Sequence, residues 1–72
     1  MGMIQGMIRI NGEGAPLSVA TLSELLVQNG VGGDGKGVAV ALNGQVVRRQ
    51  DWAATKLSAG DDVEIVRVRQ GG

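Results

Sequence analysis

The sequence has no cysteine and no histidine among its 72 residues, and Trp52 is its only aromatic residue. Without cysteine, neither a disulfide nor a zinc–thiolate site can stabilise so short a chain. Without histidine, the commonest general base and metal ligand is missing. Side-chain catalysis would fall to carboxylates, lysines and hydroxyl groups, which do not cluster in the sequence. We therefore do not expect an enzyme whose own side chains carry out a reaction.

The chain also lacks an excess of either charge, since seven Lys and Arg balance seven Asp and Glu. This balance argues against nucleic acid as a partner, because phosphate binding depends on excess positive charge. The apolar runs extend over only a few residues, so no membrane span is expected. The opening "MGMIQG" has neither the basic region nor the apolar core of a signal peptide. These features predict one cytoplasmic domain with an aliphatic core.

The first third of the chain predicts a hairpin. Met7–Ile10 alternates like a half-buried strand, which Met3 and Ile4 could extend backward. Residues 11–14 are rich in Asn and Gly and predict a turn. Residues 15–19 would then form a returning strand, and Pro16 places it at a sheet edge.

The clearest local signal is a helix start at Thr21. Thr21 and Glu24 have the spacing of a capping box, in which each side chain accepts a hydrogen bond from the other's backbone N–H. An apolar stripe follows at helical spacing: Leu22, Leu25 and Leu26. Gly30 is suited to ending a helix because it tolerates the left-handed conformation. A helix over about 22–29 is predicted, and it is too short to be stable unless it packs on a sheet.

Two local patterns suggest ligand sites but fit a simpler interpretation. Gly30–Gly37, "GVGGDGKG", approaches the phosphate-binding pattern GxxxxGK[ST]. However, Gly37 replaces the hydroxyl residue, and the segment runs from helix to strand instead of strand to helix. Asp61, Asp62 and Glu64 could be imagined as ligands of a hard metal ion, but they offer too few oxygens. We interpret the first segment as a loop, and Gly60 to Asp62 as a turn.

A second hairpin is predicted after this loop. Val38–Leu42 is a continuous apolar run, typical of a strand buried on both faces. Asn43-Gly44 is the preferred two-residue turn, and residues 45–48 would return antiparallel. Residues 51–54 could form a short turn of helix that lays Trp52 over the edge of the core, with Leu57 packing inward afterwards.

Val63 to Val68 forms the last predicted strand. Its apolar residues do not alternate strictly, so we expect a central strand with partial cover on both faces, paired with the first strand. The element order is strand, strand, helix, strand, strand, strand, which indicates an α+β domain with one helix across a sheet. The chain would then end at the rim of that sheet.

Several segments resemble the thiamine-biosynthesis sulfur carriers of the ubiquitin-like β-grasp superfamily. They are "MIRING", "TLSELL", "VAVALNGQVVRRQDW", "LSAGDDVEIV" and the terminal "GG". The resemblance runs from Met7 to Gly72, and the tryptophan after the second hairpin favours this family over the related molybdopterin carriers. It implies a β-grasp fold: a mixed sheet of about five strands with one helix packed across it. We divide the chain into an N-terminal extension (1–6), the β-grasp domain (7–68) and a C-terminal tail (69–72).

The resemblance also implies a mechanism in which the α-carboxylate of Gly72 is the working group. An adenylyltransferase of the ubiquitin-activating type would use ATP to form the acyl-adenylate. A sulfur donor would convert this to a thiocarboxylate, and thiazole synthase would take the sulfur. The chain itself would bind no cofactor or metal and would be monomeric. Gly71 and Gly72 lack Cβ atoms, so they can enter a narrow channel.

The tail also contains candidate partner contacts. We expect Arg67 and Arg69 to project from the same face of the last strand and, with Gln70, to contact partner proteins. Arg48 and Arg49 would lie near them. Such cations can steer a carrier toward acidic surfaces, although an ordinary solvated strand face is the alternative. Three other functions remain open: a molybdopterin sulfur carrier, a ubiquitin-like protein modifier, and a binding module in which the diglycine is incidental.

Overall fold

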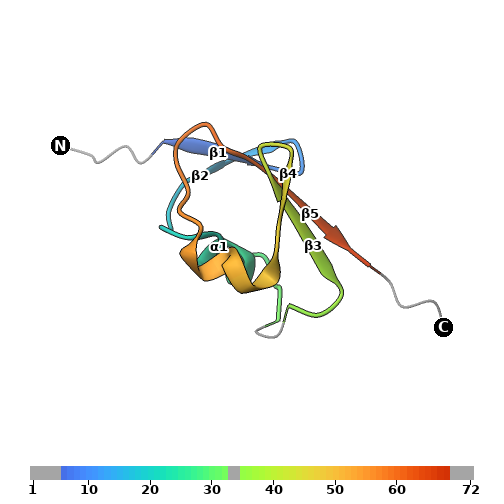
Figure 1. Ribbon diagram of the computed structural model, residues 1–72. Helices are drawn as coiled ribbons and strands as arrows, with labels where there is room; N and C mark the ends of the chain where they lie inside the picture. Colours follow the sequence, from blue (N-terminus) through green and yellow to red (C-terminus); the bar gives the residue numbers. More distant parts are fainter. Residues whose placement is uncertain (1–5, 33–34, 69–72) are drawn as a thin grey trace.

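The protein forms one five-stranded sheet with helices packed on one face (Figure 1). The computed structural model describes residues 6–32 and 35–68. Its elements are β1 (Met7–Ile10), β2 (Glu13–Pro16), α1 (Leu22–Gln28), β3 (Val38–Leu42), β4 (Gln45–Val47), the 3₁₀ helix η1 (Arg49–Ala54) and β5 (Asp62–Arg67). The strand order is β2-β1-β5-β3-β4. β1 and β5 are parallel and the other pairs antiparallel, so the predicted mixed sheet is confirmed.

Two Asn-Gly turns form the hairpins. Asn11 and Asn43 both have φ of 52°, and the glycines that follow both have φ of 85°. Positive φ at both central residues is the type I′ geometry, which matches the twist of paired strands. The predicted second turn is confirmed, and β4 ends at Val47, one residue earlier than expected.

The predicted bounds of the first turn and of β2 were wrong. The turn takes only residues 11–12, so Glu13 already pairs with Ile10, and β2 ends at Pro16 instead of running over 15–19. Beyond Pro16 the pairing continues for one more bond, from the Leu17 N–H to the Gly6 carbonyl at 3.0 Å, and the Leu17 side chain packs into the core, where it is 7% exposed. The expectation of an edge strand is confirmed, since β2 is the outermost strand on its side.

The capping box forms as predicted. Thr21 Oγ1 accepts a hydrogen bond from the Glu24 N–H, and the Glu24 carboxylate accepts from the N–H groups of Ala20 and Thr21. These backbone bonds lower the pKa of the Glu24 carboxyl below its ordinary value. The helix ends at Gln28, one residue before the predicted end, with Asn29 as C-cap.

The core lies between the sheet and the helices and is aliphatic apart from Trp52. Its buried residues are Ile8, Leu17, Leu22, Leu25, Leu26, Val31, Val40, Trp52, Val63 and Ile65. Trp52 is held at the edge of the core by η1, and its Nε1–H donates to the Val47 carbonyl at 2.9 Å. Leu57 packs against this cluster. The predicted positions of Trp52 and Leu57 are both confirmed.

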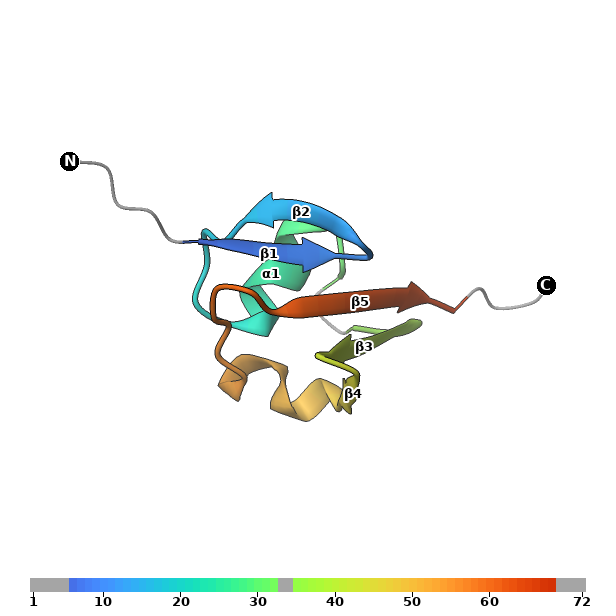
Figure 2. The ribbon, with the colours of Figure 1, turned by 90° about the horizontal axis from the view of Figure 1, so that it is seen from above.

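The opposite face of the sheet is open, which corrects the expectation for β3 and β5. Both strands were expected to have cover on both faces, but only one face carries helices (Figure 2). In β5 the alternation is regular: Val63 and Ile65 are buried, whereas Val66 is 57% exposed. In β3, Val40 is buried and its neighbour Ala39 is exposed. The apolar outward residues are therefore surface and not core.

Both turn asparagines also attach their hairpins to β5. Asn11 Oδ1 accepts from the Ile65 N–H at 2.8 Å, and Asn11 Nδ2 donates to the Ile65 carbonyl at 3.2 Å. Asn43 Oδ1 accepts from the Asp62 N–H at 2.9 Å. Each side chain thus continues a strand ladder beyond its hairpin, and β5 is held from both sides.

Candidate functional site at the end of strand β5

The end of β5 is fastened to two neighbouring segments. The Val68 N–H donates to the Gly37 carbonyl at 2.6 Å, which continues the ladder between β3 and β5. One guanidinium nitrogen of Arg67 donates to the Asn29 carbonyl at the C-terminus of α1, also at 2.6 Å. The structure therefore fixes the point from which the last four residues of the sequence continue.

The predicted working residues follow this point directly. Gly71 and Gly72, and the possible contacts Arg69 and Gln70, lie outside the described residues, so their assignments stay predictions. At about 3.3 Å per residue, the Gly72 carboxylate can lie at most about 13 Å from Val68. Any enzyme that acts on this carboxylate must come close to the end of β5.

Arg67 is exposed, and it lies on the helix-facing side of the sheet. Val63, Ile65 and Arg67 alternate along β5, so Arg67 shares the helix-facing side of the sheet. Its guanidinium supplies a cation to the C-terminus of α1, whose own last turn contains no basic residue. Cations stabilise this end of a helix by interacting with its dipole and its last carbonyls. In the sequence, Arg67 alternates with the apolar Val63 and Ile65, and this alternation indicates the side of the sheet on which it lies.

The outward side of the sheet near Val68 is apolar. Ala39 is opposite Val66, and Ala41 is opposite Val46, so these side chains share the open face. Val46 is 77% exposed, Val66 57% and Val68 56%. We call this surface the apolar half-face; it comprises Ala39, Ala41, Val46, Val66 and Val68. It lies next to the start of the tail.

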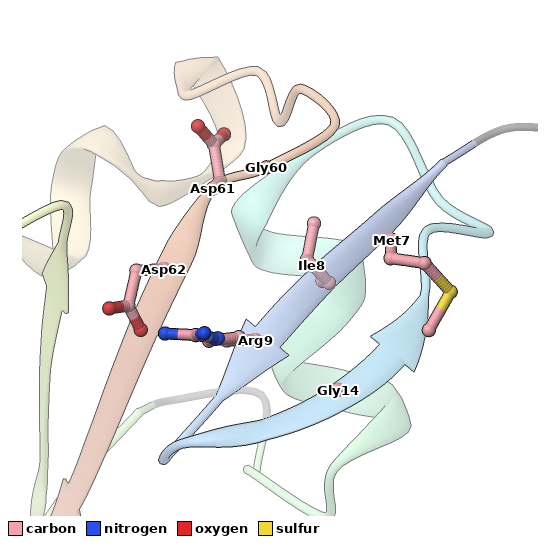
Figure 3. A pocket seen from close by; sticks show the side chains of 7 residues that line it. All are labelled: Met7, Ile8, Arg9, Gly14, Gly60, Asp61 and Asp62. Atoms are coloured by element: carbon pink, nitrogen blue, oxygen red, sulfur yellow. The ribbon is translucent and has the colours of Figure 1, made fainter.

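The other half of the open face carries charged side chains beside the exposed Met7. It contains a shallow depression of about 380 Å³ that includes Met7, Arg9 and Asp62. In Figure 3, the side chains of Arg9 and Asp62 point toward one another across β1 and β5. This depression lies at the start of β5, at the opposite end of the strand from Val68. The open face is thus divided into a half that carries charged side chains and an apolar half.

The two other candidate sites from the sequence have structural roles. The Asp61 carboxylate accepts from Asn43 Nδ2 at 3.0 Å and from the Ser58 N–H at 2.8 Å, so it organises the turn before β5. Within residues 6–32 and 35–68, no group of three acidic, histidine or cysteine residues could hold a metal ion. In the glycine-rich segment, Gly35 is buried against Trp52 and Arg49. Two residues later in the same segment, Gly37 accepts the hydrogen bond from Val68 at the end of β5.

A mixed five-stranded sheet in this order, with one α-helix across it and an exit at the central strand, defines a β-grasp protein. The family model described as "ThiS family" matches residues 8–72. The chain belongs to the ThiS family.

Individual relatives agree with this assignment. The sulfur carrier protein ThiS of Thermus thermophilus is 42% identical over 66 residues, which cover 92% of this chain and all of the relative. The crystal structure of the thiamine biosynthesis protein ThiS from Geobacter metallireducens superposes with a TM-score of 0.74 at 32% identity. That match covers 92% of this chain and 99% of the other. A solution structure of a thiamine biosynthesis protein from the same organism gives the same TM-score and identity.

In the described part of the chain, no helix is long and apolar enough to cross a bilayer.

Proposed function

We propose that this ThiS-family sulfur carrier works through the α-carboxylate of Gly72, as a co-substrate of partner enzymes and not as an enzyme itself. The observation that carries the proposal is the position of the apolar half-face beside the anchored end of β5. A partner that reaches Gly72 must lie within about 13 Å of Val68, and the apolar half-face is the exposed apolar surface beside that point. Burying it favours docking, and the exposed Glu64, opposite Ala41, borders this surface.

The chemistry follows from the weak electrophilicity of a carboxylate. A Gly72 oxygen attacks the α-phosphorus of ATP on an adenylyltransferase of the ubiquitin-activating type, and pyrophosphate leaves. A sulfur nucleophile then attacks the acyl carbon and AMP leaves. Free sulfide gives the thiocarboxylate directly; a persulfide donor gives an acyl disulfide, which a second thiol reduces. Thiazole synthase takes the sulfur from this thiocarboxylate. ATP belongs to the activating partner, and its supply places this chemistry in the cytoplasm.

The two glycines suit such a tail because it must enter an enclosed site and leave again. Neither has a Cβ, so the backbone can adopt angles closed to other residues. Ordering four residues on docking opposes binding by about 1–2 kcal/mol per residue. Weak binding is compatible with a carrier that must be released to the next enzyme.

The direct test is the intact mass of the chain after incubation with ATP, sulfide and the thiamine-pathway activating enzyme. We expect a gain equal to the exchange of one oxygen for sulfur, absent from a variant that lacks Gly72. If the enzyme modifies another carrier but leaves this chain unchanged, the proposal is wrong. High-mass adducts that depend on Gly72 would indicate a protein modifier instead.

A matched pair of variants tests the docking surface. Val66 on the apolar half-face and Val27 on α1 are similarly exposed, at 57% and 64%. Val66→Gln should raise the KM of the activating enzyme for the carrier by about tenfold, because a central apolar contact is typically worth about 1–2 kcal/mol. Val27→Gln should leave KM unchanged. Equal effects of the two substitutions would exclude the apolar half-face as the docking surface.

A further inference from the structure

We propose that Arg67 is a positioning residue for the reaction at Gly72, and that it acts with Gly37 as an anchor that sets where the tail leaves the sheet. The inference rests on the proposed function, because it concerns how the same carboxylate is presented. It assigns Arg67 a role within the chain, where the sequence suggested a contact with a partner surface.

The first half of this anchor is the bond from Arg67 to the Asn29 carbonyl, 2.6 Å long. Asn29 is the C-cap of α1, and its own side chain donates to the Leu25 carbonyl at 2.8 Å. The acceptor is therefore a rigid point on a capped helix. Because Arg67 is the last residue of β5, this bond holds the strand end against the helix layer.

The second half is the bond from the Val68 N–H to the Gly37 carbonyl. Gly37 has a φ of +72°, and a Cβ there would stand 3.3 Å from the Val68 carbonyl oxygen. A side chain at this position would therefore strain the backbone and push Val68 away by a few tenths of an ångström. Gly37 is itself two residues beyond Gly35, which is packed against Trp52. The contact of Gly35 with Trp52 thus positions the loop against the core, and the bond from Gly37 in turn positions Val68.

The two bonds hold consecutive residues: Arg67 is bonded through its side chain to the end of α1, and Val68 through its backbone N–H to the loop before β3. Together they restrict the direction of the backbone at the last residue before the tail. A tail of four residues that starts from a fixed point samples fewer positions than one that starts from a frayed strand. Apparent affinity falls in proportion to the fraction of molecules that are competent to bind. Loosening either bond should therefore weaken productive docking without altering the chemistry at Gly72.

The test compares four variants of the full chain in the mass assay with ATP, sulfide and the activating enzyme. Arg67→Met removes the donor and keeps the apolar stem, and Arg67→Lys keeps a cationic donor. Gly37→Ala disturbs the second bond without changing the charge. Lys56→Met is the control for charge, because Lys56 is exposed and pairs with Thr21, at the opposite end of α1 from Asn29. Hydrogen exchange of the Val68 amide reports the anchor directly in each variant.

We expect Arg67→Met and Gly37→Ala to raise KM about fivefold, the change in an equilibrium constant that corresponds to one net hydrogen bond. The kcat should not change, Val68 exchange should accelerate in both variants, and Arg67→Lys should return KM toward the parent value. Lys56→Met should resemble the parent.

Two results would overturn the anchor while leaving the proposed function intact. One is a raised KM in Arg67→Met with a normal KM in Gly37→Ala, which would make Arg67 a charge contact with the partner. The other is faster Val68 exchange with unchanged KM, which would make the bonds purely structural. If Arg67→Met does not fold, Gly37→Ala tests the anchor alone: a raised KM with faster Val68 exchange supports it, and an unchanged KM overturns it. A parent chain that is never modified would instead overturn the proposed function, and the anchor's role with it.

Discussion

The Asn11 side chain gives the sharpest test of how the sheet is held together. It joins residues 54 positions apart through two partly buried hydrogen bonds with Ile65. At about 0.5–1.5 kcal/mol net for each bond, the amide should contribute about 2 kcal/mol to the free energy of unfolding. For a domain of this size that corresponds to about 10 °C in Tm. Asn11→Gly removes the amide and keeps a residue suited to φ of 52°.

A matched substitution separates the bonds from the flexibility that glycine adds. Asn43 has the same φ in the same type of turn, but its side-chain bonds are exposed. Both glycine variants share the effect on the unfolded chain, about 0.5–1 kcal/mol. The difference between them therefore measures how much more the partly buried bonds of Asn11 contribute than the exposed bonds of Asn43.

The measurement is urea denaturation followed by the fluorescence of Trp52, the only tryptophan. We expect Asn11→Gly to lose about 1–2 kcal/mol more than Asn43→Gly, with equal m-values. Equal losses in the two variants would refute the reasoning, because the partly buried bonds of Asn11 would then contribute no more than the exposed bonds of Asn43.

Two further predictions concern the loop and the helix start. Gly35→Ala would place a Cβ 2.7 Å from the Trp52 ring, whereas Gly44→Ala at φ of +85° meets no atom within 4 Å. We expect the first to be about 2 kcal/mol more destabilising, with a shifted Trp52 emission; similar losses would contradict this packing. The lowered pKa of Glu24 means that its carboxylate stabilises the fold above its unfolded pKa of about 4.3, and that this contribution is lost as pH falls through the lower folded pKa. Glu24→Gln should therefore lower Tm at pH 7 by more than at pH 3, and a pH-independent difference would argue against the charged capping box.

Local signals in the sequence predicted the parts of the fold that neighbouring residues determine. Thr21 with Glu24 marked the helix start, and Asn43-Gly44 marked a hairpin turn, because both motifs are stabilised by bonds within a few residues. The terminal diglycine, together with segments along the chain such as "TLSELL" and "VAVALNGQVVRRQDW", identified the family. These features do not depend on how the sheet is assembled.

The errors arose where distant contacts decide the outcome. A strand over residues 15–19 was expected, but β2 ends at Pro16, one ladder bond before Leu17 enters the core. The apolar residues of β3 predicted burial on both faces and those of β5 partial cover on both faces, since composition alone does not show that one face lacks a covering layer. The role of Arg67 depends on Asn29, 38 positions earlier in the chain. No local pattern reports that approach.

The topology also determines when the molecule becomes complete during synthesis. The two hairpins consist of residues close in sequence, so each can pair as soon as it has been made. They are joined only by β5, which comes last in sequence and lies at the centre of the sheet. The apolar half-face includes Val66 of β5 and Val68 directly after it, so it is incomplete on a nascent or truncated chain that lacks β5. An enzyme that requires this surface would therefore distinguish finished carriers from unfinished ones.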